Sequence, residues 1–295
     1  MRVTNTLIAD RVTSNLLQQT EQLSSLQTMI SSGKRINSPS DDPIGMTKVL
    51  SYRQDIASIE QYCRNIDYGN SWLSLTETTL GSIETLLLSA QEIVAYQATG
   101  TATESTRQIA AEEIANIYDQ IIALANTQAE GRYIFSGYQT QTAPFSRDDD
   151  FNAVYSGDSG EVRIIIGQDA SIGINVDGQQ VFNDDIDVFD VLKTLKDALE
   201  SNDGDLIAEQ TERLDQAYQQ VVEQRSAVGE RLNRLELSEN YWSDVKLNRQ
   251  EMLAATEDAD IVQALTDLQT LETAYEAALA VSATLMQSSL IDFLR

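Results

Sequence analysis

Residues 31–45 read SSGKRINSPSDDPIG, and this stretch predicts the end of one helix and the start of the next. Gly33 suits the left-handed conformation that closes a helix, and the two basic residues after it complement the negative end of the helix dipole. Asp42 is the best candidate to cap the second helix, because Pro43 then takes the first helical position, where its missing N–H is harmless. We assign to this corner Gly33, Arg35, Pro39, Asp41, Asp42 and Pro43.

A narrow apolar stripe precedes the corner, and a second stripe with the same alternating three- and four-residue steps lies near the C-terminus. Gln19 interrupts the first stripe and Ser282 the second. Such a stripe must be covered by another helix, and the nearest candidate for each is the other end of the chain or a neighbouring molecule. We therefore predict an assembly seam made by Val12, Leu16, Leu23, Leu26 and Ile30, and by Ile261, Ala264, Leu268, Leu271, Tyr275, Ala278 and Leu285.

Charge and composition exclude several classes of function. The net charge of −26 disfavours nucleic acid and anionic lipid as partners. The absence of histidine removes the usual base of hydrolase triads and the commonest zinc ligand, and the single Cys63 cannot close an internal disulfide. The acidic run at 183–187 suits the cap of a helix near Asp187 better than calcium. We expect no catalytic residues, cofactor or metal.

The two ends of the chain differ in sign, since residues 1–35 are net basic and residues 251–295 are strongly acidic. Opposite charge favours pairing between them, within or between subunits. Exposed ion pairs contribute only about 0–1 kcal/mol each, so the apolar stripes must provide most of any association. The chain shows neither a secretory signal peptide nor a stretch able to cross a membrane, which taken alone suggests a cytoplasmic protein.

Beyond the corner, no helix breaker occurs from Pro43 to about Thr99, which predicts one long helix. Its apolar residues stand seven apart, as in a helix that packs along another: Tyr52, Ile59, Ile66, Leu73, Leu80, Leu87 and Val94. A short loop at Gly100–Ser105 makes the next helix its antiparallel neighbour. The stripe of that third helix is Ala110, Ile114, Ile117, Ile121 and Leu124.

Residues 131–182 hold half of the glycines and predict a small β insertion, with Asp177-Gly178 as a hairpin signal. The expected strands are Tyr133–Phe135, Val154–Ser156, Val162–Ile166 and Ile172–Val176. Helices resume at about Asp187–Ser201 and Asp205–Leu253. The second of these carries Ile207, Leu214, Val221, Val228, Leu235 and Trp242 at heptad spacing.

This nested order predicts a mainly α fold, a long antiparallel coiled-coil-like rod of helices with a small β insertion domain. Matching the halves from the outside inwards pairs the two termini with each other and the two long helices with each other. The predicted parts are the two halves of a terminal helical domain at 1–42 and 251–295, the two parts of a helical rod domain at 43–140 and 187–250, and the insertion at 141–186.

Two stretches resemble the flagellin superfamily of bacterial flagellar axial proteins. They are SSGKRINSPSDDPIG at 31–45 and GRYIFSGYQTQTAPF at 131–145, and the apolar end at 290–294 is similar to the tail of that family. The proline-bracketed PSDDP form and the TQTAPF continuation are closer to the junction proteins between hook and filament than to flagellin. The resemblance covers the N-terminal 145 residues and the C-terminal 45, while the insertion matches only in character.

The resemblance implies a structural protein that leaves the cell through the flagellar type III export apparatus without a cleaved signal peptide. It implies terminal helices in the inner tube of a flagellin-like assembly and an outward β insertion. Its implied partners are copies of itself, hook-associated protein 1, flagellin, and an export chaperone before secretion, with no nucleic acid and no membrane insertion. The implied location is extracellular, at the hook-filament junction.

Two alternatives stay open beside this interpretation. Flagellin itself would polymerise alone into long filaments, and a cytoplasmic coiled-coil scaffold would form soluble oligomers in the cell; an enzyme is the least favoured class. For the terminal stripes, the alternative is intramolecular packing in a stable monomer. We favour the hypothesis that a thin two-helix seam is weakly stable in the free subunit and folds on assembly.

Overall fold

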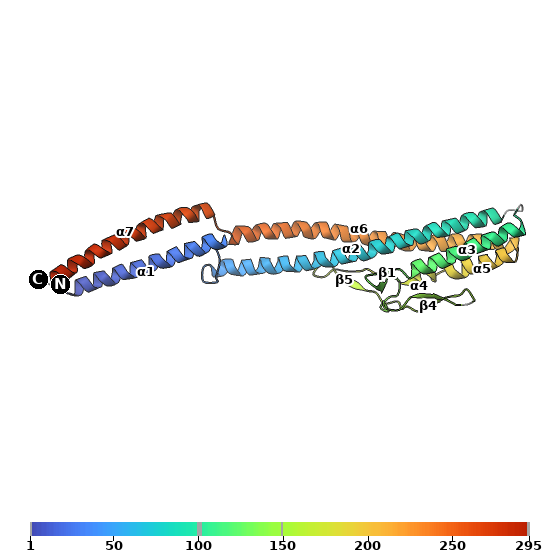
Figure 1. The fold of residues 1–295 in the computed structure, drawn as a ribbon, viewed down its shortest axis with the longest axis horizontal. Coiled ribbons are helices and arrows are strands. Elements are labelled where there is room, and N and C mark those ends of the chain that lie inside the picture. Colours follow the sequence, from blue (N-terminus) through green and yellow to red (C-terminus); the bar gives the residue numbers. More distant parts are fainter. Residues whose placement is uncertain (1, 99–101, 149, 294–295) are drawn as a thin grey trace. The chain divides into compact units, whose positions relative to one another are not determined.

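The computed structural model describes residues 2–98, 102–148 and 150–293, and this part of the chain is mainly helical (Figure 1). Its helices are α1 (Arg2–Ser32), α2 (Pro43–Gln97), α3 (Glu104–Ala125), α4 (Gly178–Phe182), α5 (Val188–Glu200), α6 (Gly204–Glu257) and α7 (Ile261–Phe293). The predicted mainly α fold, with long antiparallel helices and a small β insertion, is confirmed.

The chain divides into two compact units, and both long helices contribute to each of them. The first unit is Met1–Ser58 with Val245–Arg295, and the second is Ile59–Asp244. The division between the units falls within the residue ranges of α2 and α6, whereas the domain boundaries predicted from sequence differ from it and remain predictions.

In the second unit, α2 and α6 run antiparallel and bury their heptad residues against each other. Polar pairs fix the direction, because Asn70 contacts Glu239 near one end and Gln91 contacts Asp215 near the other. The heptad prediction is confirmed for Ile59, Ile66, Leu73, Leu80, Leu87 and Val94, and for Ile207, Leu214, Val221, Val228 and Leu235, all of them buried. Trp242 is half-buried, and its indole N–H donates to the Ile166 carbonyl oxygen at 2.6 Å.

An arginine on α6 joins this helix to α2 at the border of the apolar seam. Arg225 Nε donates to Glu77 Oε1 at 2.8 Å, and its Nη1 donates to Glu84 Oε2 at 2.7 Å. The Tyr218 hydroxyl donates to the other oxygen of Glu84 at 3.1 Å. These bonds link the two long helices at a partly exposed border of the seam, because the side chains of Arg225 and Glu77 are 40% and 33% exposed. Solvent screens such pairs, so they contribute less to stability than the buried leucines beside them.

α3 packs on α5, and the predicted stripe of α3 provides its buried face. Ala110, Ile114, Ile117 and Ile121 are buried and Leu124 is half-buried. Thr103 caps α3 through a reciprocal hydrogen-bonded box with Thr106. Asp187 caps α5 as predicted, since its Oδ1 accepts from the backbone N–H groups of Phe189 and Asp190. Burial raises the pKa of Asp187, although these two hydrogen bonds oppose the shift.

In the described part of the β insertion, the strands form three separate antiparallel pairs. The pairs are β1 (Gln128–Ala129) with β2 (Arg132–Tyr133), β3 (Phe145–Arg147) with β4 (Ala153–Tyr155), and β5 (Arg163–Ile165) with β6 (Ser171–Gly173). The strand expected at 154–156 is confirmed with the same length and lies one residue earlier, whereas the strands expected at 162–166 and 172–176 are confirmed in place but are shorter. Of the strand expected at 133–135, Tyr133 alone is in a strand, and β1 and β3 were not predicted.

The hairpin turn predicted at Asp177-Gly178 is wrong. Asp177 instead caps α4, because its Oδ1 accepts from the Gln179 N–H at 2.9 Å. Gly178 is required here by space, since a Cβ at this position would lie 2.6 Å from the Phe135 carbonyl oxygen. The Asp-Gly pair therefore reflects a helix cap and a close backbone approach, two features that share residue types with a tight turn.

Candidate assembly surface

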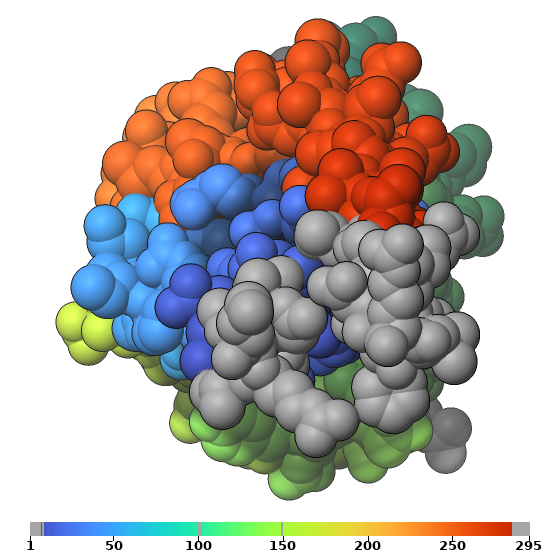
Figure 2. Space-filling view, turned by 90° about the vertical axis from the view of Figure 1, so that its left-hand side faces the viewer, coloured from blue at the N-terminus to red at the C-terminus, as the bar shows by residue number. Residues whose placement is uncertain are grey.

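The terminal helices α1 and α7 pack along each other in the first unit (Figures 1 and 2). The predicted stripes are partly buried in this unit, and their role as an assembly seam remains a prediction. On α1, the half-buried residues include Val12, Leu16, Gln19, Leu23, Leu26 and Ile30, whereas Leu17 is 63% exposed. On α7, Ala264 is buried and Leu268, Leu271, Tyr275, Ala278 and Ser282 are half-buried. Ile261 is exposed, and the side chain of Leu285 lies outside the described residues.

The two stripes cover each other only in part. A shallow groove of about 450 Å³ lies between the helices, and its walls include Ser25 and Leu26 from α1 and Thr270 and Leu271 from α7. Most seam side chains are therefore half-buried, unlike the fully buried heptad residues of α2 and α6. An apolar stripe that one neighbour leaves half uncovered has free area for another helix.

The corner between α1 and α2 has the predicted local structure. Gly33 closes α1 with φ of +73°, and its N–H donates to the Met29 carbonyl oxygen at 2.9 Å. Asp42 caps α2, because its Oδ1 accepts from the Gly45 N–H at 2.9 Å, and Pro43 is the first residue of the helix. Pro39 lies on the exposed turn between them. The cap-and-turn prediction is confirmed at both ends of the corner.

Asp41 organises the turn itself. Its Oδ2 accepts from the backbone N–H groups of Asn37 and Ser38 at 2.9 and 2.8 Å, and its Oδ1 accepts from the Ser38 hydroxyl at 2.9 Å. These hydrogen bonds, that of the Ser38 backbone above all, lower the pKa of Asp41. One carboxylate therefore fixes two consecutive residues of the corner through three hydrogen bonds.

The partner of this corner is Glu257 at the end of α6, a residue that was not predicted from the sequence. The carboxylate of Glu257 is 3% exposed and lies 2.6 Å from Lys34 Nζ, and Arg53 of α2 donates to the same oxygen. Arg35 donates from its guanidinium to the Thr256 carbonyl oxygen at 2.8 Å. The opposite charge of the two ends is thus used at the corner. The only indication in the sequence was the opposite net charge of the two ends, and that difference does not identify which residues form ion pairs.

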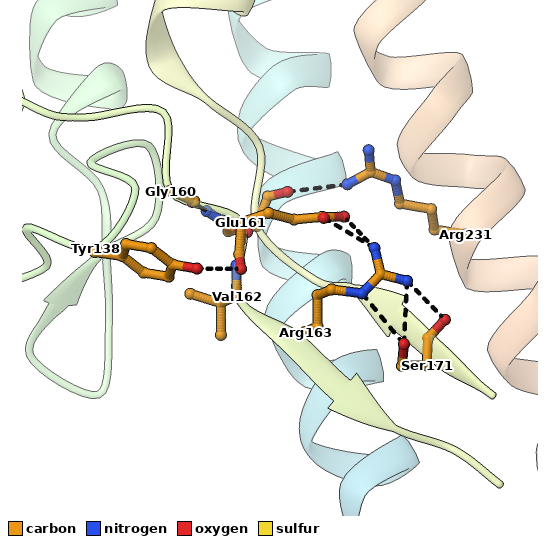
Figure 3. A network of polar contacts seen from close by, with 8 residues as sticks. Tyr138, Gly160, Glu161, Val162, Arg163, Ser171 and Arg231 are labelled. Carbon is orange, nitrogen blue, oxygen red and sulfur yellow. Dashed lines mark hydrogen bonds and ion pairs between the residues drawn. The ribbon is translucent and has the colours of Figure 1, made fainter. Parts of the chain in front are cut away.

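A second set of contacts fastens the β insertion to α6 in the other unit (Figure 3). Arg231 of α6 donates to the Asn175 backbone oxygen at 2.9 Å, and the Asn175 side chain bridges the Gly160 oxygen and the Val162 N–H, both at 2.7 Å. The Tyr138 hydroxyl donates to the Glu161 carbonyl oxygen at 2.9 Å. Tyr138 belongs to the stretch at 131–145, so that stretch is held to residues 160–162 within the insertion.

The Tyr138 ring also explains a glycine. It lies against Gly160, where a Cβ would overlap the ring atoms. On the neighbouring hairpin, Arg163 Nη1 pairs with Glu161 at 2.8 Å and its Nε donates to the Ser171 hydroxyl at 3.2 Å (Figure 3). Tyr138 and Arg163 therefore have packing and hydrogen-bonding roles, and their partners Gly160, Glu161 and Ser171 all lie within the insertion.

Within the described ranges, no group of three or more histidine, cysteine, aspartate or glutamate residues is placed to hold a metal ion. Among the same residues, no helix is both long enough and apolar enough to cross a membrane.

Two family models match the chain. The model of the bacterial flagellin N-terminal helical region matches residues 3–140, and that of the flagellin C-terminal helical region matches residues 211–294. The chain belongs to the bacterial flagellin family. The two matched regions contain the two sides of the corner, since Lys34 and Arg53 lie in the first and Glu257 in the second.

Within the flagellin family, several curated relatives are structural proteins of the flagellum. Flagellar hook-associated protein 3 of Escherichia coli is 29% identical over 256 residues, which cover 78% of this chain and 80% of that protein. The protein of the same name from Salmonella typhimurium is 32% identical over 62% of this chain and 57% of its own length. Flagellin of Bacillus subtilis is 26% identical over 90% of each chain.

Solved structures agree with this placement in the flagellin family. A structure from Vibrio parahaemolyticus, described as a flagellar hook-associated protein, superposes with a TM-score of 0.69 and 26% identity, covering 74% of this chain and all of that one. The flagellar junction protein FlgL of Legionella pneumophila, 18% identical, shares the fold with a TM-score of 0.61 over 73% of this chain and all of its own.

Proposed function

We propose that this flagellin-family chain is a structural subunit of the junction between hook and filament of the bacterial flagellum. The observation that carries the proposal is the 29% identity to the Escherichia coli hook-associated protein 3 over 78% of the chain. The subunit self-assembles helically and adapts the packing on the hook side to that on the filament side. It performs no catalysis.

The half-covered pair of terminal helices supports this role, because a subunit of a tube must keep apolar area for its neighbours. The assembly seam is the pair of stripes around Leu26 and Leu271, which line the open groove between α1 and α7. Copies of the chain cover this groove in the assembly. The fixed corner at 33–43 holds the terminal helices in the direction that these contacts need.

The same proposal defines the partners and the route of the protein. Hook-associated protein 1 lies on the hook side and flagellin on the filament side, and an export chaperone binds the chain in the cytoplasm. The protein is exported by the flagellar type III apparatus without a cleaved signal peptide and stays outside the cell at the hook-filament junction.

Deletion of the gene tests the assignment. A cell without its junction subunit builds hooks but cannot attach a filament, so we expect intact hooks on the cells and flagellin monomers in the medium. Electron microscopy of the cells and immunoblotting of the culture medium measure both. Filaments of normal length on the deletion strain would contradict the proposal. Expression of the wild-type chain from a plasmid is the control and should restore filaments.

Flagellin is the second candidate, because the Bacillus subtilis flagellin aligns with 90% of this chain. A filament subunit grows long polymers by itself, whereas a junction subunit forms only short assemblies. Incubation of the purified chain with short filament seeds, followed by electron microscopy, separates the two. Long filaments made of this chain alone would favour flagellin.

A further inference from the structure

Two corners of the chain lie side by side in the first unit, and backbone hydrogen bonds join them. One is the corner between α1 and α2, and the other is the corner between α6 and α7. The Ala259 N–H donates to the Gly33 carbonyl oxygen at 3.0 Å, and the Arg35 N–H donates to the Glu257 carbonyl oxygen at 2.7 Å. Lys34 and Asp258 face each other between these bonds as an antiparallel bridge.

Glu257 stands at a position that is unfavourable for a lone carboxylate. It is the last residue of α6, where the helix dipole is negative, and its side chain is 3% exposed. Lys34 Nζ lies 2.6 Å from Oε1, and the Arg53 guanidinium donates to the same atom. The two cations come from the end of α1 and from α2, so one buried carboxylate binds both sides of the first corner to the second.

Arg35 adds a further connection between the two corners. Its guanidinium donates to the Thr256 carbonyl oxygen, one of the last carbonyls of α6, and lies 3.7 Å from Asp42 Oδ2. Asp42 also caps α2 through Gly45. The C-terminal end of α6 and the N-terminal cap of α2 are thus bound to one side chain, which complements both charges.

We propose that Glu257 is a positioning residue that latches the two corners together, so that they open and close as one joint and not as two independent hinges. The latch consists of Glu257, Lys34 and Arg53. When the latch is released, α1 and α7 can change direction at the same time. The reason is that the two backbone hydrogen bonds between the corners lie beside the same three side chains. The latch is a property of the single chain and holds whichever flagellar structure the chain builds.

The substitution Glu257→Gln tests the latch in the purified full-length protein, because it removes the charge and nearly keeps the size. We measure amide hydrogen exchange by mass spectrometry. The amides of Arg35 and Ala259 should exchange about tenfold faster or more, and both should change together. Glu251→Gln is the matched control, since Glu251 is an exposed residue of the same helix and should leave both segments as in the wild type. Unchanged exchange in Glu257→Gln, or a change at one corner alone, overturns the latch.

A double-substitution cycle with Lys34→Met separates the latch from a general loss of stability. If Lys34 and Glu257 act as one device, the double variant exchanges at the corners little faster than either single variant. Purely additive effects overturn the proposal. Amides of the buried helices in 59–244 are the internal reference, and faster exchange there as well as at the corners means general unfolding, which also overturns it. The gene deletion described above has no bearing on this result, so the two proposals fail separately.

Discussion

At the scale of the residue, Gly45 shows how tightly the corner is packed. A Cβ at this position would overlap Asp42 Oδ2 and lie 2.6 Å from Ile36 Cδ1. Gly45→Ala should therefore lower the free energy of unfolding by about 1–3 kcal/mol, through displacement of the Asp42 cap and the buried Ile36. Thermal unfolding followed by circular dichroism measures the effect.

The matched control for Gly45→Ala is Gly229→Ala in α6. A Cβ at Gly229 meets nothing within 4 Å, so the helix gains from alanine and the free energy of unfolding should rise by up to about 1 kcal/mol. The two identical chemical changes thus have opposite expected signs. A gain in stability for Gly45→Ala would show that the corner can open at little cost.

The corner residues that act on their own helix ends could be predicted from the sequence, whereas the corner residue that pairs with a distant part of the chain could not. Gly33 and Asp42 act on their own helix ends, so the residue type and the neighbouring sequence were enough. Glu257 takes its role from Arg53, which is 204 residues away. Nothing in the sequence near Glu257 indicates which cation faces it, because that depends on how the four helices of the first unit meet.

At the scale of the element, the heptad face of α2 makes a quantitative prediction. Leu80 is fully buried on this face, whereas Leu88 on the same helix is 40% exposed. Leu80→Ala should lower the free energy of unfolding by about 2–5 kcal/mol, because it leaves a cavity between α2 and α6. Leu88→Ala should lower it by less than about 1 kcal/mol. Urea unfolding of both variants, with equal denaturant slopes, measures the difference. Equal losses would contradict the assignment of the seam.

Long helices were predictable because their signal repeats many times, and the short elements of the insertion were not. The buried heptad of α2 returns at every seventh residue from Ile59 to Val94. In contrast, β1 and β2 have two residues each, which is too short for an alternating pattern. The helix α4 has five residues and is held by Phe182, which packs against other aromatic rings, a tertiary contact that local sequence does not reveal.

At the scale of the whole molecule, the two compact units differ in how completely they bury their apolar residues. The second unit has fully buried positions along α2, α3, α5 and α6. The pair formed by α1 and α7 in the first unit has mainly half-buried seam residues and an open groove. Hydrophobic stabilisation follows the apolar area removed from water, so the terminal pair gains less per residue for the same entropic cost of ordering.

This difference predicts that the terminal helices are largely unfolded in the free subunit and become ordered on assembly. In dilute purified protein, amides of residues 5–30 and 260–290 should exchange at close to the rate of an unstructured chain, while the buried segments of 59–244 stay protected. In assembled material the terminal amides should become protected, because neighbouring copies cover the groove. Amide exchange of both samples by mass spectrometry gives the comparison within one protein. Strong protection of both terminal segments in the dilute monomer would contradict the prediction, since it would mean that α1 and α7 are sufficient partners for each other.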